Sequence, residues 1–335
     1  MPKFLYGLTG VLESMVLSLG SHGDEVRQLE QRLQDLNLYT GSIDGVFGGG
    51  VQSAVKSFQG ANGLAADGVV GSQTWSALFP GADPPAAPSI AGEDITQRCL
   101  ALTGAFETST GVPDCYCGLT GNFDGQGISF GVLQWNLGQG TLQPMLAEML
   151  TAHADVAANI FQDNLQALTA MLASNRDQQL AWAQSIQDPI RFTVFEPWKG
   201  FFQALGRASE YQAIQAEHAS QIQQRARTMC GQMGVTTERA IALLFDICVQ
   251  NGSLSPATVA TIQTDFGQIP AGDPMDVEVA KLQAIANRCA EASLPAYVED
   301  VRARKLTIAN GQGTVHNVPY NLEQQFGIRL QPFAG

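Results

Sequence analysis

The stretch GNFDGQGISFGVLQWN, residues 121–136, places a carboxylate, four glycines and a hydroxyl within eleven residues and then turns apolar. It is too short and too rich in turn residues for a helix, which predicts a β-hairpin or an extended loop. Glycines tolerate positive φ and let a backbone approach a ligand closely. We therefore expect this stretch to present Asp124 and Ser129, and the apolar run at 132–135 to anchor it in a core.

Outward from this stretch, the sequence after residue 94 is mainly helical in pattern. Apolar residues recur at i, i+3, i+4 and i+7 in six segments, which is the spacing of one helix face. The fold class expected is therefore mainly α, with a short β-hairpin at the glycine-rich stretch. The predicted helices cover residues 95–107, 142–150, 156–172, 211–229, 237–249 and 277–292.

A change of composition marks a domain boundary. The segment GADPPAAPSIAGED, residues 81–94, holds three prolines and four alanines and shows neither helical nor alternating periodicity. Such a composition is typical of a semi-extended linker. We predict an N-terminal domain at 1–80, a linker at 81–93 and a larger domain at 94–335.

The N-terminal domain contains an internal half-repeat. IDGVFGGGVQSAV carries the pair Asp44-Gly45, and ADGVVGSQTWSAL carries Asp67-Gly68, 23 positions later. An Asp-Gly pair favours a tight turn, and the small residues after it allow a helix to begin close to that turn. Helical spacing also precedes the first turn, in GDEVRQLEQRLQDLNL, so a small helical domain with two similar turns is expected.

Residues 17–80 strongly resemble the small three-helix peptidoglycan-binding domain of cell-wall hydrolases. LGSHGDEVRQLEQRL, DGVFGGGVQSAVKSFQ and GLAADGVVGSQTWSAL carry the resemblance, although Val51 stands where that family more often has a threonine. The resemblance implies wall contacts around the two Asp-Gly turns, with Asp44, Phe47 and Asp67 as the candidate residues. Phe47 also fits a plain core position, because apolar residues at helical spacing are usually buried.

The charge of the chain limits its partners. A formal net charge of −13 and a pI near 4.6 argue against nucleic-acid binding, which begins with basic residues neutralising phosphates. Up to residue 80 there are 4 basic and 7 acidic residues, which leaves 14 basic and 24 acidic residues after it. The field of the second domain therefore favours a neutral or cationic ligand.

Membrane insertion, metals and cofactors are not expected. No run of 18 apolar residues occurs, and Glu13 interrupts the moderately apolar N-terminus, which lacks a signal-peptide cleavage pattern. We expect a monomer made in the cytoplasm without a signal peptide that acts at a bacterial wall or periplasm, released by a phage or delivered by a secretion system. Six cysteines and four scattered histidines lack the spacing of metal ligands, so no metal and no cofactor are predicted.

Two carboxylates are candidates for glycosidic cleavage, although on spacing alone they also fit solvated surface charges. Glu107 closes the first predicted helix of the second domain, and Asp124 lies 17 positions later in the glycine-rich stretch. One sheltered acid can protonate a leaving oxygen while a second carboxylate acts from the opposite side of the sugar. Ser129 is a candidate to hold a water beside Asp124. Gln126, Gln134 and Asn136 of the same stretch are the candidate substrate-binding residues.

The second domain, from about residue 94 to 330, resembles the chitosanase branch of the lysozyme superfamily in three patches. DGQGISFGVLQW is similar to its catalytic hairpin, and LLFDICVQNGSLS and RARKLTIANGQGTVHNVPYNLEQQFGI to later parts. The resemblance implies that Glu107, Asp124 and Ser129 are catalytic. It also implies an ion-pair network behind Glu107 made by Asp246 and Arg304, with Arg302 as an alternative. Cys115-Tyr116-Cys117 has no place in the pattern.

These observations favour a peptidoglycan hydrolase that cuts the bond between N-acetylmuramic acid and N-acetylglucosamine by acid and base catalysis. Inversion at the anomeric carbon is expected if the carboxylates stand about 6.5 to 9.5 Å apart, which leaves room for a water. A chitosanase is the alternative enzyme, since an acidic domain suits a polycationic glycan. A wall-binding protein without activity is the third hypothesis, and a phage endolysin and a secreted antibacterial effector both fit the first.

Overall fold

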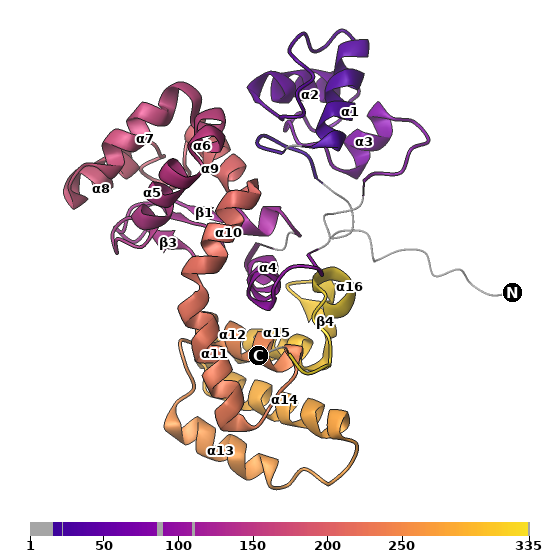
Figure 1. Cartoon of the computed structure of the whole chain (residues 1–335), viewed down its shortest axis with the longest axis vertical. Helices are drawn as coiled ribbons and strands as arrows, with labels where there is room; N and C mark the ends of the chain where they lie inside the picture. Colours follow the sequence, from indigo (N-terminus) through magenta and orange to yellow (C-terminus); the bar gives the residue numbers. More distant parts are fainter. Residues whose placement is uncertain (1–15, 22, 86–89, 109–110, 334–335) are drawn as a thin grey trace, which may run out of the picture. The chain divides into compact units, whose positions relative to one another are not determined.

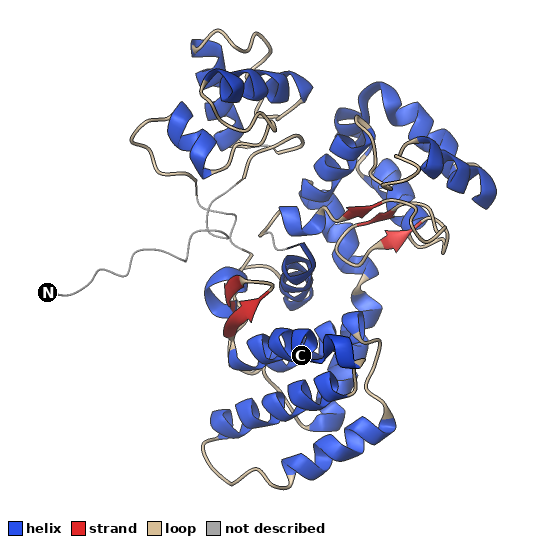
Figure 2. Ribbon diagram, turned by 180° about the vertical axis from the view of Figure 1, so that it is seen from behind, coloured by secondary structure: helices blue, strands red, loops and turns tan. Residues whose placement is uncertain are grey.

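The computed structural model describes residues 16–21, 23–85, 90–108 and 111–333 (Figure 1). Helices dominate, as the sequence predicted, and the strands form two small antiparallel sheets (Figure 2). The chain divides into two compact units. The described residues of unit 1 are 90–108 and 216–333, and those of unit 2 are 16–85, apart from 22, and 111–215.

The N-terminal part of unit 2 is the predicted three-helix module. Its helices are α1 (Asp24–Asp35), α2 (Gly49–Ala61) and α3 (Ser72–Leu78). A bridge between Leu17 and Val70 closes the module beside the helices. The helices bury one continuous apolar cluster, which supplies the hydrophobic stabilisation of this small domain; it includes Val26, Leu29, Leu33, Phe47, Val51, Val55, Phe58, Trp75 and Leu78.

The remainder of unit 2 surrounds the glycine-rich stretch. Three two-residue strands pair in the order β1-β2-β3, with Ser129 opposite Thr120 on one side and Asn136 on the other. Helices pack their apolar faces on this sheet around Phe130, Phe202 and Tyr211. The elements are η1 (Asp114–Tyr116), β1 (Leu119–Thr120), β2 (Ser129–Phe130), β3 (Trp135–Asn136), α5 (Leu142–Ala152), α6 (Ala154–Phe161), η2 (Gln162–Asn164), α7 (Leu165–Leu172), α8 (Arg176–Ser185) and α9 (Trp198–Arg207).

Unit 1 is a helical cluster with a terminal hairpin. Helix α15 packs on α14 and α12, and α12 also packs on α4. Polar caps set the starts of three helices: the side chains of Thr237, Ser255 and Asp273 accept backbone N–H bonds at the first turns of α12, α13 and α14. The elements are α4 (Ile95–Thr108), α11 (Ser220–Met233), α12 (Glu238–Gln250), α13 (Pro256–Phe266), α14 (Pro274–Glu291), η3 (Pro295–Tyr297), α15 (Val298–Asn310), β4 (Gln312–Val315), β5 (Val318–Asn321) and α16 (Leu322–Phe326).

Two segments expected to be single helices are each broken. Residues 156–172 run through α6, η2 and α7, because Gln162 adopts φ 48° and ψ −129°, outside the helical region. Residues 211–229 contain the end of α10 (Ser209–His218) and the start of α11, with Ala219 between them. Ala219 has φ −84° and ψ −4°, which is close to helical values. The break therefore leaves the apolar periodicity of the sequence almost unchanged.

Within the described residues, no helix combines the length and the apolar character that crossing a bilayer requires. All six cysteines are free thiols. Five of them are buried, and the sixth, Cys117 of the unexplained Cys-Tyr-Cys motif, is partly buried. Burial raises the pKa of the Cys117 thiol to about 12. This thiol contacts the carbonyl oxygens of Gln203 and Pro113, both within its own unit.

Candidate functional site

Glu107 lies in the last turn of α4, in unit 1. Its side chain is 49% exposed, while Phe106 beside it is fully buried. The guanidinium of Arg304, on α15, donates from Nη1 to Glu107 Oε1 at 2.5 Å. Glu107 is therefore a half-exposed carboxylate held from its buried side by one cation.

Arg304 reaches Glu107 from the interior. Its side chain is only 2% exposed, and its guanidinium carbon lies 5.1 Å from the centre of the Phe106 ring. The Nε and Nη2 atoms donate to the carboxylate of Asp246, at 3.0 Å and 2.7 Å. One guanidinium thus joins Asp246 to Glu107, and the rigid fork of donors fixes the position of the Glu107 carboxylate.

Asp246 is the buried centre of this charge cluster. It sits on α12 with no exposed surface and also accepts a hydrogen bond from the hydroxyl of Thr103 at 3.2 Å. Burial by itself would raise the pKa of the Asp246 carboxyl, but the adjacent cations of Arg304 and Lys305 outweigh it and hold that pKa well below its usual range. Asp246 is therefore ionised at neutral pH.

Lys305 is the fourth member of the cluster, and the sequence reasoning did not include it. Its ammonium is fully buried and donates to the Asp246 carboxylate, to the Asp246 carbonyl at 3.3 Å and to Gln250 Oε1 at 2.7 Å. Burial lowers the pKa of Lys305, and Asp246 opposes that change. The only sequence signal was its position next to Arg304. Arg302, the alternative partner, instead contacts Glu299 and Asn287.

The hairpin of β4 and β5 secures the end of α4. Helix C-termini leave carbonyl oxygens without intrahelical partners. The Tyr320 hydroxyl donates to the Ala105 carbonyl at 2.9 Å, and His316 Nδ1 lies 3.2 Å from the Phe106 carbonyl. The other ring nitrogen of His316 lies 2.8 Å from the carboxylate of Asp300 on α15. These bonds tie the backbone just before Glu107 to the β4–β5 hairpin and, through His316 and Asp300, to the helix that carries Arg304.

Asp124, in unit 2, has different surroundings. It is exposed in the loop between β1 and β2, and its Oδ1 accepts one bond, at 3.0 Å, from the backbone N–H of Gln126. The loop keeps its shape through Asn122, whose side chain accepts from Gly127 N at 2.8 Å and whose own N–H donates to Gln187 Oε1. Gly127 has φ 78°, a conformation that favours glycine. Asp124 is thus presented without an adjacent cation among the described residues.

The other candidates in this stretch differ in exposure: Ser129 and Asn136 are nearly buried, whereas Gln134 is exposed and Gln126 is partly exposed. Ser129 is 8% exposed within β2, and Asn136, at 7%, accepts the backbone N–H of Gln139. Gln134 lies in the turn between β2 and β3, where its amide bonds to Thr120 and to backbone carbonyls. Gln126 is partly exposed beside Asp124. Glu107 belongs to unit 1, whereas all of these residues belong to unit 2.

The module residues separate into two groups. Asp44 and Asp67 are exposed at the two turns, and each accepts the backbone N–H two residues ahead at 2.9 Å. Phe47 is fully buried in the core of the module. Phe47 therefore serves packing, the alternative expected for it, and the exposed turns remain the candidates for wall contact.

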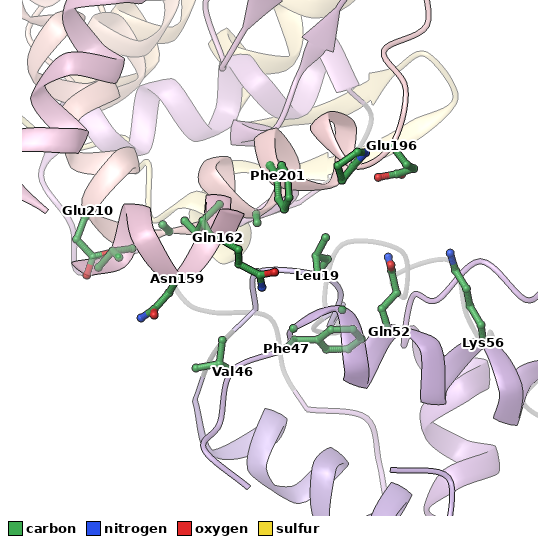
Figure 3. Close-up of a pocket in the computed structure, with 18 residues that line it drawn as sticks. Leu19, Val46, Phe47, Gln52, Lys56, Asn159, Gln162, Glu196, Phe201 and Glu210 are labelled. Atoms are coloured by element: carbon green, nitrogen blue, oxygen red, sulfur yellow. The ribbon is translucent and has the colours of Figure 1, made fainter. Parts of the chain in front are cut away.

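Unit 2 also contains a pocket of ≈ 460 Å³ (Figure 3). Its lining includes the apolar side chains of Leu19, Phe47 and Phe201 and the charged side chains of Lys56 and Glu196. None of the candidate catalytic residues lines it, so it supports no catalytic assignment. Among the residues that the structure describes, no three His, Cys, Asp or Glu side chains gather as a metal ion would require.

Comparison with known proteins identifies the module. Residues 22–78 match the family "Putative peptidoglycan binding domain", as the sequence patterns predicted. Relatives include the N-acetylmuramoyl-L-alanine amidase CwlM of Mycobacterium tuberculosis, 48% identical over 58 residues, which are 17% of this chain and 14% of that protein. The spore cortex-lytic enzyme of Bacillus subtilis is 44% identical over 67 residues, 20% of this chain and 22% of the enzyme. This chain spans only 14% and 22% of the lengths of these two curated relatives.

Solved structures show a looser likeness over more of the chain. A chitosanase from Bacillus subtilis MY002 is 18% identical, with a TM-score of 0.40, covering 66% of this chain and 87% of that one. Chitosanase OU01 is 16% identical, also with a TM-score of 0.40, covering 70% and 99%. A Burkholderia AP3 phage endolysin covers 87% and 99%, at 17% identity and a TM-score of 0.20. At these values the likeness carries no conclusion about substrate or mechanism.

Proposed function

We propose that this chain is a cell-wall glycosidase that binds peptidoglycan through its N-terminal module and cleaves the glycan strand. The bond cut is the one between N-acetylmuramic acid and N-acetylglucosamine. The observation that carries the proposal is the setting of Glu107, a half-exposed carboxylate bonded to the fully buried Arg304. The match of residues 22–78 to the peptidoglycan-binding family supports the choice of substrate.

In the proposed reaction, Glu107 is the general acid. Its proton goes to the glycosidic oxygen as the bond to the anomeric carbon breaks, and the leaving sugar departs with a new hydroxyl. Arg304 positions the carboxylate through Nη1, because its other donors are fixed on Asp246. After proton transfer, the cation stabilises the Glu107 carboxylate that forms.

Asp124 is the proposed general base. It removes a proton from the water that attacks the anomeric carbon, which inverts the configuration there. Its exposure and its single backbone bond support this role, because its second carboxylate oxygen has no hydrogen-bond partner among the described residues. Ser129 is proposed to hold the attacking water, and Gln126, which is partly exposed, to contact the sugar.

A chitosanase is the second candidate, and one observation favours it. The chain after residue 80 holds 24 acidic and 14 basic residues, and such a field attracts a polycationic glycan. An inactive wall-binding protein is the third. The ordered charge cluster behind Glu107 argues against it, since binding by the module alone would not need Arg304 to be buried against two carboxylates.

The test is digestion of purified sacculi by the full chain, followed by borohydride reduction and identification of the reduced sugar. Reduced N-acetylmuramic acid is the expected product, and chitosan serves as the parallel substrate. Release of reduced glucosamine from chitosan alone would select the second candidate. Sedimentation with sacculi but no new reducing ends would select the third. The enzyme is proposed to act as a monomer at the bacterial wall, reached by phage release or by a secretion system.

A further inference from the structure

The two Asp-Gly turns of the module are built around one buried side chain each. At the second turn this side chain is Gln59, on α2, which is 1% exposed. Its Oε1 accepts from Gly68 N at 2.9 Å, and its Nε2 donates to Asp67 Oδ1 at 2.9 Å and to the Val69 carbonyl at 2.9 Å. Both ends of the amide are satisfied, so the second turn needs no titratable group inside it.

Glu30, on α1, takes the corresponding place at the first turn. It is fully buried, and its Oε2 accepts from Gly45 N at 2.8 Å, as Gln59 Oε1 does from Gly68 N. Among the described residues, Oε1 of Glu30 has no hydrogen-bond partner. An ionised carboxylate has no hydrogen to donate, so the bond that Gln59 gives to Asp67 has no counterpart at the first turn while Glu30 is charged.

The groups around Glu30 compensate a charge on its carboxyl only in part, because Arg27 lowers the pKa of that carboxyl less than burial and Asp44 raise it. Asp44 lies within hydrogen-bonding reach of its carboxyl. The nearby cation, Arg27, is bonded to Asp24 at 2.9 Å and to the Asp44 carbonyl at 3.3 Å. Tyr39, the other titratable neighbour, donates its hydroxyl to a backbone carbonyl instead.

The ionisation of Glu30 follows from these neighbours. Burial raises its pKa, the Gly45 N–H lowers it, and Asp44 raises it further. A raised pKa in the folded state means that this carboxyl stabilises the module at acidic pH, and that the stabilisation is lost as the pH rises through the folded-state pKa. This dependence is opposite in sign to that of a salt-bridged carboxylate.

We propose that a protonated Glu30 donates a hydrogen bond to Asp44 at the first turn, as the Gln59 amide donates one to Asp67 at the second turn. The first turn is then held closed by a proton that can be titrated, which we call the proton lock, and the second turn is not. The proton sits on Oε1 and is donated to the Asp44 carboxylate. Its loss leaves two like charges beside each other, one of them buried. This inference about the turn stands without the proposed function; its consequence for wall retention rests on that function, because Asp44 is a candidate wall contact.

Hydrogen exchange on the full chain, followed by mass spectrometry between pH 4 and 8, tests the lock. Protection of the peptide with Gly45 is compared with that of the peptide with Gly68, each corrected for its intrinsic exchange rate. As the pH rises, protection at the first turn should fall in total by about tenfold for each unit by which the folded-state pKa of Glu30 exceeds its ordinary value. Protection at the second turn should stay constant. A wild-type first turn with flat protection would overturn the proposal.

Two reciprocal substitutions sharpen the test, and each keeps the size of the side chain. Glu30→Gln gives the first turn the chemistry of the second, so its protection should become high and independent of pH. Gln59→Glu should make the second turn pH-dependent. Glu25→Gln, on the same helix as Glu30, removes one charge away from the turn and should leave both profiles unchanged. Persistence of the pH dependence in Glu30→Gln would also overturn the proposal.

Sedimentation with sacculi measures the consequence for binding, in a Glu107→Gln background that prevents digestion. Retention of the chain with native Glu30 should fall as the pH rises, while retention of the Glu30→Gln form should not change with pH. Identical pH profiles of retention for the two forms would show that the ionisation of Glu30 does not affect binding to sacculi, and would overturn that consequence of the proposal. Failure of both forms to sediment at any pH would refute the proposed function, while the exchange profiles still decide whether the proton lock exists.

Discussion

Glu107 and Asp124, the two candidate catalytic carboxylates, are held in opposite ways. Glu107 ends a helix and is bonded to Arg304, which belongs to a buried cluster with Asp246 and Lys305. Asp124 is exposed in a glycine-rich loop and accepts one backbone N–H. The position of the acid therefore depends on a buried charge cluster that also supports the fold of its unit, whereas the position of the base depends on the shape of its loop alone. Changes to the cluster behind Glu107 should therefore affect folding and activity together, and changes at Asp124 should affect mainly activity.

The largest expected effect is on the acid itself. Glu107→Gln keeps the shape of the side chain but cannot protonate the leaving oxygen, so release of reducing ends from sacculi should fall by about 10²- to 10⁴-fold. The melting temperature should change little, because Arg304 keeps its bonds to Asp246. Glu299→Gln, a carboxylate with an 85% exposed side chain in the same unit, is the matched control. Near-normal activity of Glu107→Gln would remove the basis of the catalytic assignment.

The second effect joins stability to activity. Arg304→Ala removes one partner of a buried pair and should cost about 3 to 5 kcal/mol of unfolding free energy, measured by urea titration. Activity should fall as well, because Glu107 loses its positioning cation. Arg302→Ala is the comparison, since Arg302 is partly exposed and bonds to Glu299 and Asn287, and it should cost about 0 to 1 kcal/mol. Equal costs for the two variants would show that the cluster does not support the fold.

The third effect isolates the base. Asp124→Ala should lower the rate on sacculi by about 10²-fold, the lower end for removal of a general base, because solvent still reaches the exposed loop. Its unfolding free energy should change only by about 0.5 to 1.5 kcal/mol, the value of one hydrogen bond. Added azide should restore cleavage in this variant and form a glycosyl azide of inverted configuration.

A different outcome would reassign Asp124. A covalent glycosyl-enzyme trapped on wild-type Asp124 would mean a retaining mechanism with Asp124 as the nucleophile. A large loss of stability in Asp124→Ala would instead contradict the contrast between the two carboxylates. The same experiment therefore tests both the mechanism and the structural comparison.

The sequence predicted features that local pattern controls. The module helices, the mainly helical fold and the strands at the glycine-rich stretch follow from periodicity and turn chemistry, which act over a few residues. The burial of Lys305 and the proton sharing inferred for Glu30 did not follow, because each depends on partners 14 to 59 positions away. The prediction of one continuous helix over 156–172 was wrong because the backbone at Gln162 leaves the helical region, although the apolar pattern continues through that position.

The smallest expected effect is on the pH dependence of the unfolding free energy, to which two buried carboxyls, Asp246 and Glu30, should contribute with opposite signs. Arg304 and Lys305 outweigh burial and hold the pKa of Asp246 well below its usual range, whereas burial and Asp44 raise the pKa of Glu30. A depressed folded-state pKa gives stability that is present above the unfolded pKa, about 3.9 for Asp, and is lost as the pH falls below it. Protonation of the unfolded chain should therefore remove about 1 kcal/mol of the contribution of Asp246 between pH 7 and pH 3.

Urea titrations of the wild type and Asp246→Asn at both pH values measure this loss, since the variant has no carboxyl to titrate at that position. The stability gap between them should narrow as the pH falls. The gap between the wild type and Glu30→Gln should also narrow toward acid, because the wild type gains stability as Glu30 takes up its proton and the variant has no carboxyl to titrate at that position. Asp265→Asn, which breaks a partly exposed pair with Arg288, should show a weaker trend because solvent screens that pair more than it screens the buried cluster. An Asp246→Asn gap that stays constant or widens in acid would mean that the cations do not stabilise the ionised form of Asp246, and the cluster could not then hold Arg304 in place for Glu107.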